Sequence, residues 1–142
     1  MANRTRQLGN FRSGNNLYVD VTNSRVGVGT TVPSTTLQVA GTITCVDVNS
    51  TSDINLKENI HSIDDPLGKV MQINGVGFRW KDTKEDAIGV IAQDIEEVIP
   101  EIVKNNDHIK TVNYNGLIGV LIEAIKEQQR QILELKAQIN DK

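Results

Sequence analysis

Ser52 and Lys57 are the two residues whose types and spacing could perform covalent chemistry. In the stretch SDINLK, the serine hydroxyl could attack a carbonyl carbon if a neighbouring base accepted its proton. A lysine acts as that base only when it is neutral, which requires a pKa well below its usual value of about 10.4. The same stretch also fits a helix that begins at Ser52 and carries Lys57 on its surface. From these residues alone, both interpretations stay open.

The separation of five residues limits how the two side chains could meet. It corresponds to about 140° around an α-helix and to opposite faces of a β-strand, so neither element brings them together. Either the chain turns sharply at Asp53–Asn55, or Lys57 approaches a serine on a neighbouring copy. Ser52 could attack its own preceding carbonyl or one on another chain, and the sequence does not separate these routes. Both need a donor that stabilises the oxyanion.

The composition of the chain changes next to Ser52. Residues 1–51 contain four arginines and two acidic residues but no lysine, glutamate or histidine, whereas the remainder has a net charge of −5. Segments that differ this much are expected to fold as separate parts. The 142-residue chain has a net charge of −3, which gives no general reason to expect nucleic acid or an anionic membrane as a partner.

Several classes of site are excluded on similar grounds. Cys45 is the single cysteine, so no intrachain disulfide can form, and we expect it to be buried in a strand. No apolar run approaches the roughly 20 residues that span a bilayer, and the N-terminus lacks the apolar core of a signal peptide. His61 and His108 have no partners at metal-ligand spacing. We therefore expect no metal, no cofactor and no membrane insertion.

Residues 1–51 have the pattern of short, half-buried strands. Apolar residues alternate with polar ones, and glycine and proline divide the segment into pieces of about three to six residues. A segment of this size with only two aromatic residues buries too little apolar surface to fold alone. We expect a β-rich fibre segment that intertwines with identical copies. The alternating sets are Leu17/Val19/Val21, Val26/Val28, Leu37/Val39 and Ile43/Cys45.

Residues 52–142 have the pattern of a small mixed α/β domain, which makes the expected fold class α+β. A helix is predicted to begin after Asp65, with Pro66 at its first position. A second helix is predicted to carry apolar residues 91, 95, 98 and 99 at helical spacing and to end at Pro100. One hairpin is predicted over residues 76–92, with Phe78 and Trp80 in the core, and another around Asn105–Asp107.

The C-terminal segment, residues 117–142, predicts a long helix that forms a coiled coil. Its apolar residues repeat with a seven-residue period over three repeats, with charged and amide residues elsewhere. Asn113 or Asn115 could cap its start. An amphipathic helix that packs only on its own domain is the alternative. The seam residues are Ile118, Leu121, Ile125, Gln128, Ile132, Leu135 and Ile139.

Four stretches of the second segment resemble a known family in their order and spacing. They are TSDINLKENI, GVGFRWK, AIGVIAQDIEEVIPEIV and TVNYNGLIGVLIEAIKEQQRQI. Together they are similar to the C-terminal intramolecular chaperone domain of phage endosialidases, tail spikes and tail fibres. The combination of a Ser-Asp-x-x-Leu-Lys-x-Asn-Ile motif with a downstream Gly-Val-x-Ala-Gln motif is specific. The resemblance covers residues 52–142.

The resemblance implies a homotrimer in which the domain brings three chains into register and then cuts itself off. It also implies that the scissile bond is Thr51–Ser52, with Ser52 as nucleophile and Lys57 as general base. The domain would then be a single-turnover serine endopeptidase with a Ser/Lys dyad. Because Lys57 must lose solvent to become neutral, we expect cleavage to follow correct assembly. The candidate supporting residues are Asp53, Asn55 and His61.

We therefore expect a phage tail-fibre or tail-tip protein that is assembled in the host cytoplasm and carried in the virion. Its expected partners are copies of itself, other tail and fibre proteins and a host surface receptor. The alternative is a structural fibre tip with the same fold, no cleavage and a retained C-terminal domain. A DNA-binding regulator is disfavoured because residues 1–51 show no basic patch or helix-turn-helix pattern.

Overall fold

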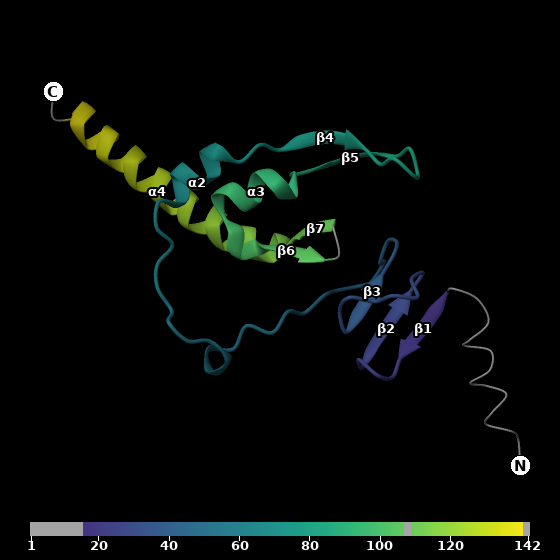
Figure 1. Cartoon of the computed structure of the whole chain (residues 1–142). Coiled ribbons are helices and arrows are strands. Elements are labelled where there is room, and N and C mark those ends of the chain that lie inside the picture. The colour runs from purple at the N-terminus through teal and green to yellow at the C-terminus, as the bar shows by residue number, and fades with distance from the viewer. Residues whose placement is uncertain (1–15, 107–108, 141–142) are drawn as a thin grey trace, which may run out of the picture. The chain divides into compact units, whose positions relative to one another are not determined.

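The computed structural model describes residues 16–106 and 109–140. The chain divides into two compact units, Met1–Leu56 and Lys57–Lys142, and Figure 1 labels their α-helices and strands. The described residues contain α-helices and small β-sheets, so the predicted combination of helices and strands is confirmed. No helix among them combines the length and the apolar character that a membrane span needs.

The first unit contains a three-stranded sheet. Its strands are β1 (Leu17–Asp20), β2 (Arg25–Val28) and β3 (Leu37–Val39), which confirms three of the predicted strands. The strand order is β1-β2-β3, with β1 antiparallel to β2 and β2 parallel to β3. In the turn before β2, the Asp20 carboxylate accepts hydrogen bonds from Asn23 N and Nδ2 at 3.1 and 2.7 Å. These bonds hold the pKa of Asp20 below its usual value.

The loop between the two parallel strands folds over one face of this sheet. Gly29 begins the loop with a φ of +71°, a conformation that glycine adopts without steric cost. The Arg25 guanidinium donates to the Pro33 carbonyl oxygen at 2.9 Å. A Cβ atom on Gly27 would lie only 2.3 Å from the Thr30 carbonyl oxygen, so a larger residue there would displace the loop. Gly27 and Pro33 are the buried residues in the described part of this unit.

The strand predicted at Ile43/Cys45 is absent. Residues 41–53 form neither helix nor strand, and Cys45 is exposed instead of buried, so both predictions were wrong. The alternating pattern there is not paired with any of the three described strands. An extended segment without a partner gains neither ladder hydrogen bonds nor cross-strand packing. The pattern identified residues suited to a strand but not the neighbour that a strand needs.

In its described residues, the second unit contains three α-helices, two hairpins and a small apolar core. The buried core residues are Ile95, Ile99, Ile102 and Val120. The helices predicted after Asp65 and before Pro100 are confirmed. The elements are α2 (Pro66–Gln72), β4 (Val76–Arg79), β5 (Asp86–Gly89), α3 (Ala92–Val98), the 3-10 helix η2 (Pro100–Ile102), β6 (Val103–Asn106), β7 (Ile109–Val112) and α4 (Tyr114–Asn140).

Side-chain caps fix where two of these helices begin. Asp65 adopts a left-handed conformation before α2, and its Oδ1 accepts a hydrogen bond from Gly68 N at 3.1 Å, as the sequence predicted. At the start of α4, Asn113 Oδ1 accepts hydrogen bonds from Asn115 N at 3.1 Å and Gly116 N at 3.4 Å. Asn113 is therefore the capping residue of the two that were considered.

Both predicted hairpins are confirmed, with two corrections to their details. β4 pairs with β5, and the rings of Phe78 and Trp80 meet edge to face with centroids 5.1 Å apart. Trp80 is exposed and Phe78 is only half-buried, so neither ring belongs to the core, where both were expected. β6 pairs with β7, but Asn105 lies within β6, and Asp107 of the predicted turn lies outside the described residues.

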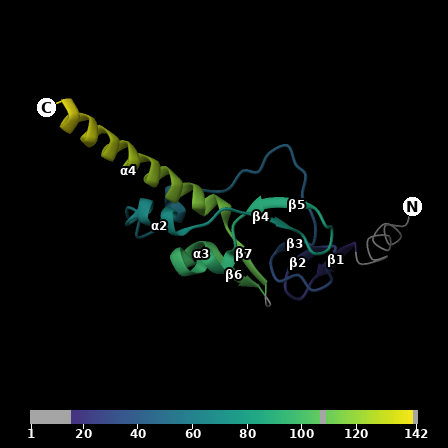
Figure 2. The same ribbon diagram turned by 90° about the horizontal axis from the view of Figure 1, so that it is seen from above.

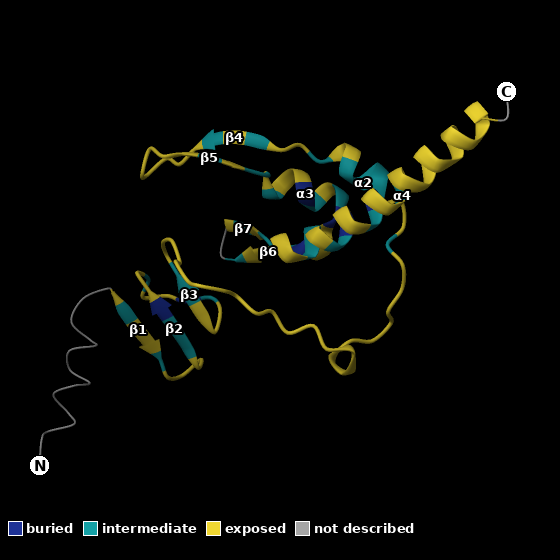
Figure 3. Cartoon of the chain, turned by 180° about the vertical axis from the view of Figure 1, so that it is seen from behind, coloured by how far each residue is buried: buried dark blue, intermediate teal, exposed yellow. Residues whose placement is uncertain are grey.

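α4 presents two different apolar faces. Its N-terminal half packs on the core through Leu117, Val120 and Ala124, which recur at helical spacing. The predicted seam residues lie on a neighbouring face, and all of them are exposed on the single chain. Figures 1 and 2 show the C-terminal half of α4 extending past the other helices, and Figure 3 shows this half as exposed. The core therefore uses a face of the helix other than the seam.

Two glycines of α4 provide a matched test of this packing. A Cβ atom on Gly116 would lie 2.5 Å from Ile102 Cγ2, whereas one on Gly119 would make ordinary contact with Ile63 Cδ1 at 3.9 Å. Alanine gains up to about 1 kcal/mol over glycine in a helix, but overpacking costs about 1–3 kcal/mol. We expect Gly119→Ala to preserve or raise the free energy of unfolding and Gly116→Ala to lower it relative to Gly119→Ala. Urea denaturation measures both, and equal values would contradict the tight contact.

The β4–β5 hairpin predicts a pH effect. The Arg79 guanidinium donates to both Asp86 carboxylate oxygens, at 2.7 and 3.0 Å, and lowers the pKa of Asp86. Because the folded pKa is depressed, the pair stabilises the hairpin above the unfolded pKa of about 3.9, and this contribution is lost as pH falls through the folded pKa. We expect Arg79→Gln to raise the pKa of Asp86 in an NMR titration, while Arg130→Gln leaves it unchanged. An unchanged pKa in Arg79→Gln would contradict the pairing.

Candidate functional site

The chain turns sharply directly after Ser52. A short 3-10 helix, η1 (Ile54–Leu56), is closed by the Asp53 carbonyl oxygen, which accepts a hydrogen bond from Leu56 N at 3.2 Å. Asp53 Oδ1 accepts two more hydrogen bonds, from Asn55 N at 2.8 Å and from Asn55 Nδ2 at 2.9 Å. An aspartate that bonds the backbone two residues ahead forms an Asx turn. Asp53 and Asn55 therefore shape the backbone next to the candidate nucleophile.

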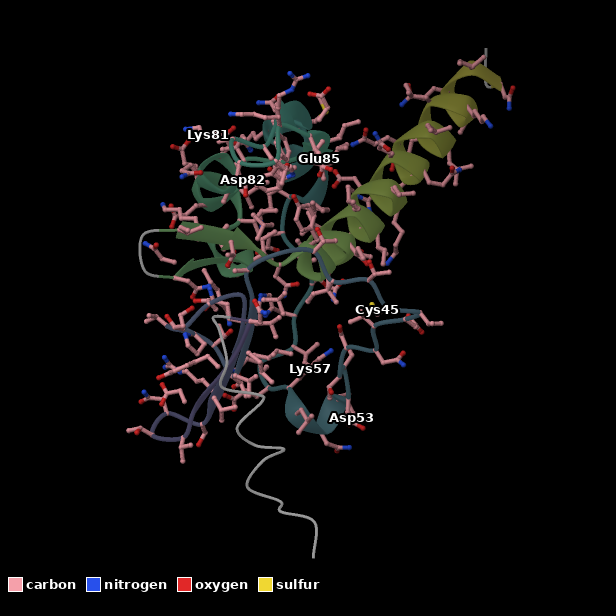
Figure 4. All side chains as sticks on the ribbon, turned by 90° about the vertical axis from the view of Figure 1, so that its right-hand side faces the viewer. Cys45, Asp53, Lys57, Lys81, Asp82 and Glu85 are labelled. Carbon is pink, nitrogen blue, oxygen red and sulfur yellow. The ribbon has the colours of Figure 1, made fainter. Side chains whose placement is uncertain are left out.

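Lys57 follows this turn, and Figure 4 labels it together with Asp53. The two compact units divide between Leu56 and Lys57, so the candidate nucleophile and the candidate base belong to different units. The side chains of Ser52 and Lys57 are both exposed. The proposed chemistry requires a shielded lysine, and a single chain does not provide that burial. The sharp turn that was one of the two alternatives from the sequence is present. Whether Lys57 acts on Ser52 of its own chain or of a neighbouring copy stays a prediction.

His61 lies beside a pocket of the second unit. Its Nδ1 is 2.8 Å from the carbonyl oxygen of Asn59, a residue with a φ of +52°. The open pocket has a volume of about 340 Å³ and is lined by both core residues and charged residues. No local pattern in the sequence indicated this pocket. A supporting role of His61 toward Lys57 stays a prediction. The lining residues are His61, Ile63, Asp64, Lys69, Ile99, Glu101, Ile102, Gly116 and Val120.

The predicted seam forms one stripe along α4. Its seven residues, Ile118 to Ile139, lie on a helix that continues without interruption through Asn140. A strict seven-residue repeat stays on one side of a helix, drifting by about 20° per repeat. The stripe is therefore an apolar surface that a second helix could cover, and coiled-coil pairing stays a prediction.

Charged side chains of the second unit pair with each other. The ion pair between Lys110 and Glu96 joins β7 to α3, and it is half-buried. Arg79–Asp86 and Lys126–Glu123 are exposed pairs. Within residues 16–106 and 109–140, no three histidine, cysteine, aspartate or glutamate side chains lie close enough together to hold a metal ion.

The family is decided by comparison with known proteins. Residues 52–104 match the family described as chaperone of endosialidase. The chain carries a chaperone-of-endosialidase domain. The match begins at Ser52, at the compositional change and four residues before the first compact unit ends at Leu56. It ends in β6, so α4 lies beyond the matched residues of this domain.

Relatives of the chain are long tail fibre proteins. It is 34% identical over 113 residues to the long tail fiber protein Gp37 of Salmonella phage S16, covering 71% of this chain and 15% of that protein. It is 32% identical over 98 residues to Gp37 of Enterobacteria phage K3, covering 62% of this chain and 8% of that protein. The chain with its chaperone-of-endosialidase domain thus spans less than a sixth of the length of these relatives.

Proposed function

We propose that this chain belongs to a phage tail fibre, and that its chaperone-of-endosialidase domain assembles three copies and then releases itself by cutting Thr51–Ser52. The observation that carries the proposal is the coincidence of features at Ser52. The family match begins there, the composition changes there, and the compact units divide shortly afterwards. A chaperone that releases itself needs its boundary at the bond that it cuts.

The seam of α4 drives the proposed assembly. Six of its seven residues are isoleucine or leucine, and all are exposed on the single chain. Full burial of one such side chain contributes about 1.5–3 kcal/mol. Gln128 interrupts the apolar seam, and a polar residue at such a position sets the register of the helices at a cost in stability. Three helices in one register would place three identical N-terminal segments side by side.

The proposed cleavage uses the hydroxyl of Ser52. Neutral Lys57 accepts the hydroxyl proton as Ser52 Oγ attacks the carbonyl carbon of Thr51, and the bond from that carbon to the Ser52 nitrogen breaks as the nitrogen takes a proton. The product is an ester between the Thr51 carbonyl and Ser52 Oγ. Water then opens the ester, which leaves a carboxylate at Thr51 and regenerates the hydroxyl of Ser52.

Neighbouring copies supply the burial that Lys57 needs in this mechanism. The side chain is exposed on a single chain, and loss of water favours the neutral form of a lysine. An assembly that covers Lys57 therefore activates the base. Cleavage then follows assembly without a separate signal.

The proposed location is the virion, with other tail and fibre proteins as partners and a host receptor as the target of the finished fibre. The support is the similarity to long tail fibre proteins of phages. A second candidate function is a structural fibre tip that keeps the domain. Lys57 is exposed on the single chain. If assembly also leaves this side chain exposed, the second function is favoured.

Self-cleavage is tested by the intact mass of freshly purified protein. We expect the wild type to yield a fragment that begins at Ser52 and Ser52→Ala to remain whole. Loss of the general base slows such a step by about 10²–10⁴-fold, so Lys57→Ala should release the fragment slowly or not at all. Lys81→Ala, which removes an exposed lysine of a hairpin turn, should cleave as the wild type does. Whole chains in every sample would favour the retained tip.

The same samples show which copy supplies the base. Chains with Ser52→Ala keep Lys57, and chains with Lys57→Ala keep Ser52. If the base comes from a neighbour, trimers formed by co-expression of the two variants should cut the Lys57→Ala chains. If these trimers stay whole, the Lys57 of each chain acts on the Ser52 of the same chain.

The seam is tested by two neighbouring residues of similar exposure. Ile132 lies in the seam and is 45% exposed, whereas Leu133 lies outside it and is 57% exposed. In a Ser52→Ala background, we expect Ile132→Asp to shift the trimer toward monomer by burying a charge between helices. Leu133→Asp should leave the trimer intact. Sedimentation velocity measures both, and two trimers or two monomers would count against the seam.

A further inference from the structure

An aspartate lies four residues before the candidate base. Asp53 and Lys57 stand at positions i and i+4 of the stretch SDINLK. In a regular α-helix, side chains at this spacing lie on the same face, and an acidic residue there pairs with the lysine that follows it. Such a pair favours the protonated form of the lysine. A lysine held in this way could not accept the proton of Ser52, so an ordinary helical turn would disable the proposed base.

The backbone of the turn does not have the geometry that favours this pair. η1 is a 3-10 helix, and the hydrogen bond from Leu56 N to the Asp53 carbonyl oxygen spans three residues. With three residues per turn, a 3-10 helix aligns Asp53 with Leu56 and not with the residue after it. A fourth residue at this geometry lies about 120° away around the axis, compared with about 40° in an α-helix.

The carboxylate of Asp53 is also engaged within the turn. Its Oδ1 accepts hydrogen bonds from Asn55 N at 2.8 Å and from Asn55 Nδ2 at 2.9 Å. The backbone donor is available to any residue at this position except proline, whereas the second donor requires a side-chain amide that reaches back to Asp53. The Asn55 carboxamide therefore adds a second bond that holds the carboxylate in the turn.

We propose that Asn55 is a positioning residue for self-cleavage, because its carboxamide retains the Asp53 carboxylate in the turn and so keeps it from forming an ion pair with Lys57. The inference rests on the proposed function, since it concerns the base of that reaction. Attraction between opposite charges grows as water is excluded. If the carboxylate were released, covering Lys57 would strengthen the ion pair instead of favouring the neutral amine. Burial activates the lysine only while Asp53 is held elsewhere.

Other titratable groups lie close to Lys57 along the chain, namely Glu58 and His61. His61 Nδ1 is 2.8 Å from the carbonyl oxygen of Asn59. Both groups are kept in every variant described below, as is any charged group that a neighbouring copy contributes. Differences between the variants therefore measure the effect of Asp53 and Asn55.

The test is the pH dependence of self-cleavage in the whole chain, compared among the wild type, Asn55→Ala, Asp53→Asn and the double variant. Each is made by cell-free translation with a labelled amino acid and moved to buffers of different pH, and the fragment that begins at Ser52 is followed with time. We expect Asn55→Ala to cleave about 3- to 10-fold more slowly than the wild type at neutral pH. It should reach the wild-type rate at high pH, where an ion-paired lysine also loses its proton.

The other variants separate charge from the shape of the turn. Asp53→Asn removes the charge but keeps an oxygen that can accept the same hydrogen bonds, so we expect its pH profile to match that of the wild type. The double variant should match Asp53→Asn, because it has no carboxylate to release. Asn74→Ala changes an exposed asparagine elsewhere and should leave the profile unchanged. Ser52→Ala versions of all samples, examined by sedimentation velocity at the same pH, show whether they assemble alike.

Each result supports or overturns the inference. Slower cleavage by Asn55→Ala at neutral pH alone, reversed in the double variant, supports it. Equal slowing at every pH, no slowing, or a double variant as slow as Asn55→Ala overturns it and leaves the proposed cleavage intact. If Asn55→Ala does not assemble, Asp53→Asn decides: a wild-type profile supports the inference, and faster cleavage at neutral pH shows that the carboxylate already acts on Lys57 and overturns it. An assembled wild type that cuts at no pH overturns the proposed cleavage as well.

Discussion

A shortage of buried apolar surface in the single chain is the constraint on which the rest of the structure depends. The buried hydrophobic residues of the described structure are Ile95, Ile99, Ile102, Val120 and Ala124, and all of them lie in the second unit. The first unit buries only Gly27 and Pro33 in its described part. A chain that leaves its strands and half of a long helix exposed gains little from folding alone. Under the proposed function, the chains therefore fold and associate together. Their free energy of folding is then inseparable from their free energy of association.

The same constraint links structure to chemistry. Serine and lysine are common surface residues, and Asp53 shapes the turn between them through local hydrogen bonds. Nothing in such a turn distinguishes a catalytic lysine from a solvated one. What distinguishes them is the loss of water, and in the proposed mechanism this comes from the covering of surface that the single chain leaves open. The reactive state would thus be a property of the assembly.

Local rules predicted the elements that local interactions determine. Asp65 with Pro66 marked the start of α2, Pro100 ended α3, and alternation identified the strands of both hairpins. The same alternation failed at Ile43/Cys45, because a strand exists only when a partner pairs with it, and one sequence does not state where that partner is. Trp80 was expected in the core, yet it is exposed beside a sheet of only two strands. The pocket beside His61 was missed because its lining comes from several separate segments.

The continuity of α4 has a mechanical consequence. Its first turns are fixed by the Asn113 cap and by the hydrogen bond from Asn113 N to the Ile102 carbonyl oxygen at 2.7 Å, while residues 128–140 are all exposed. A helix of 27 residues is about 40 Å long. It therefore acts as a lever: a tilt of about 10° at the capped end moves the tip by about 7 Å at this length. Conversely, a helix bundle that holds the C-terminal end of α4 would restrict the tilt at its N-terminal end. The bundle would therefore set the orientation of the small core that is attached there.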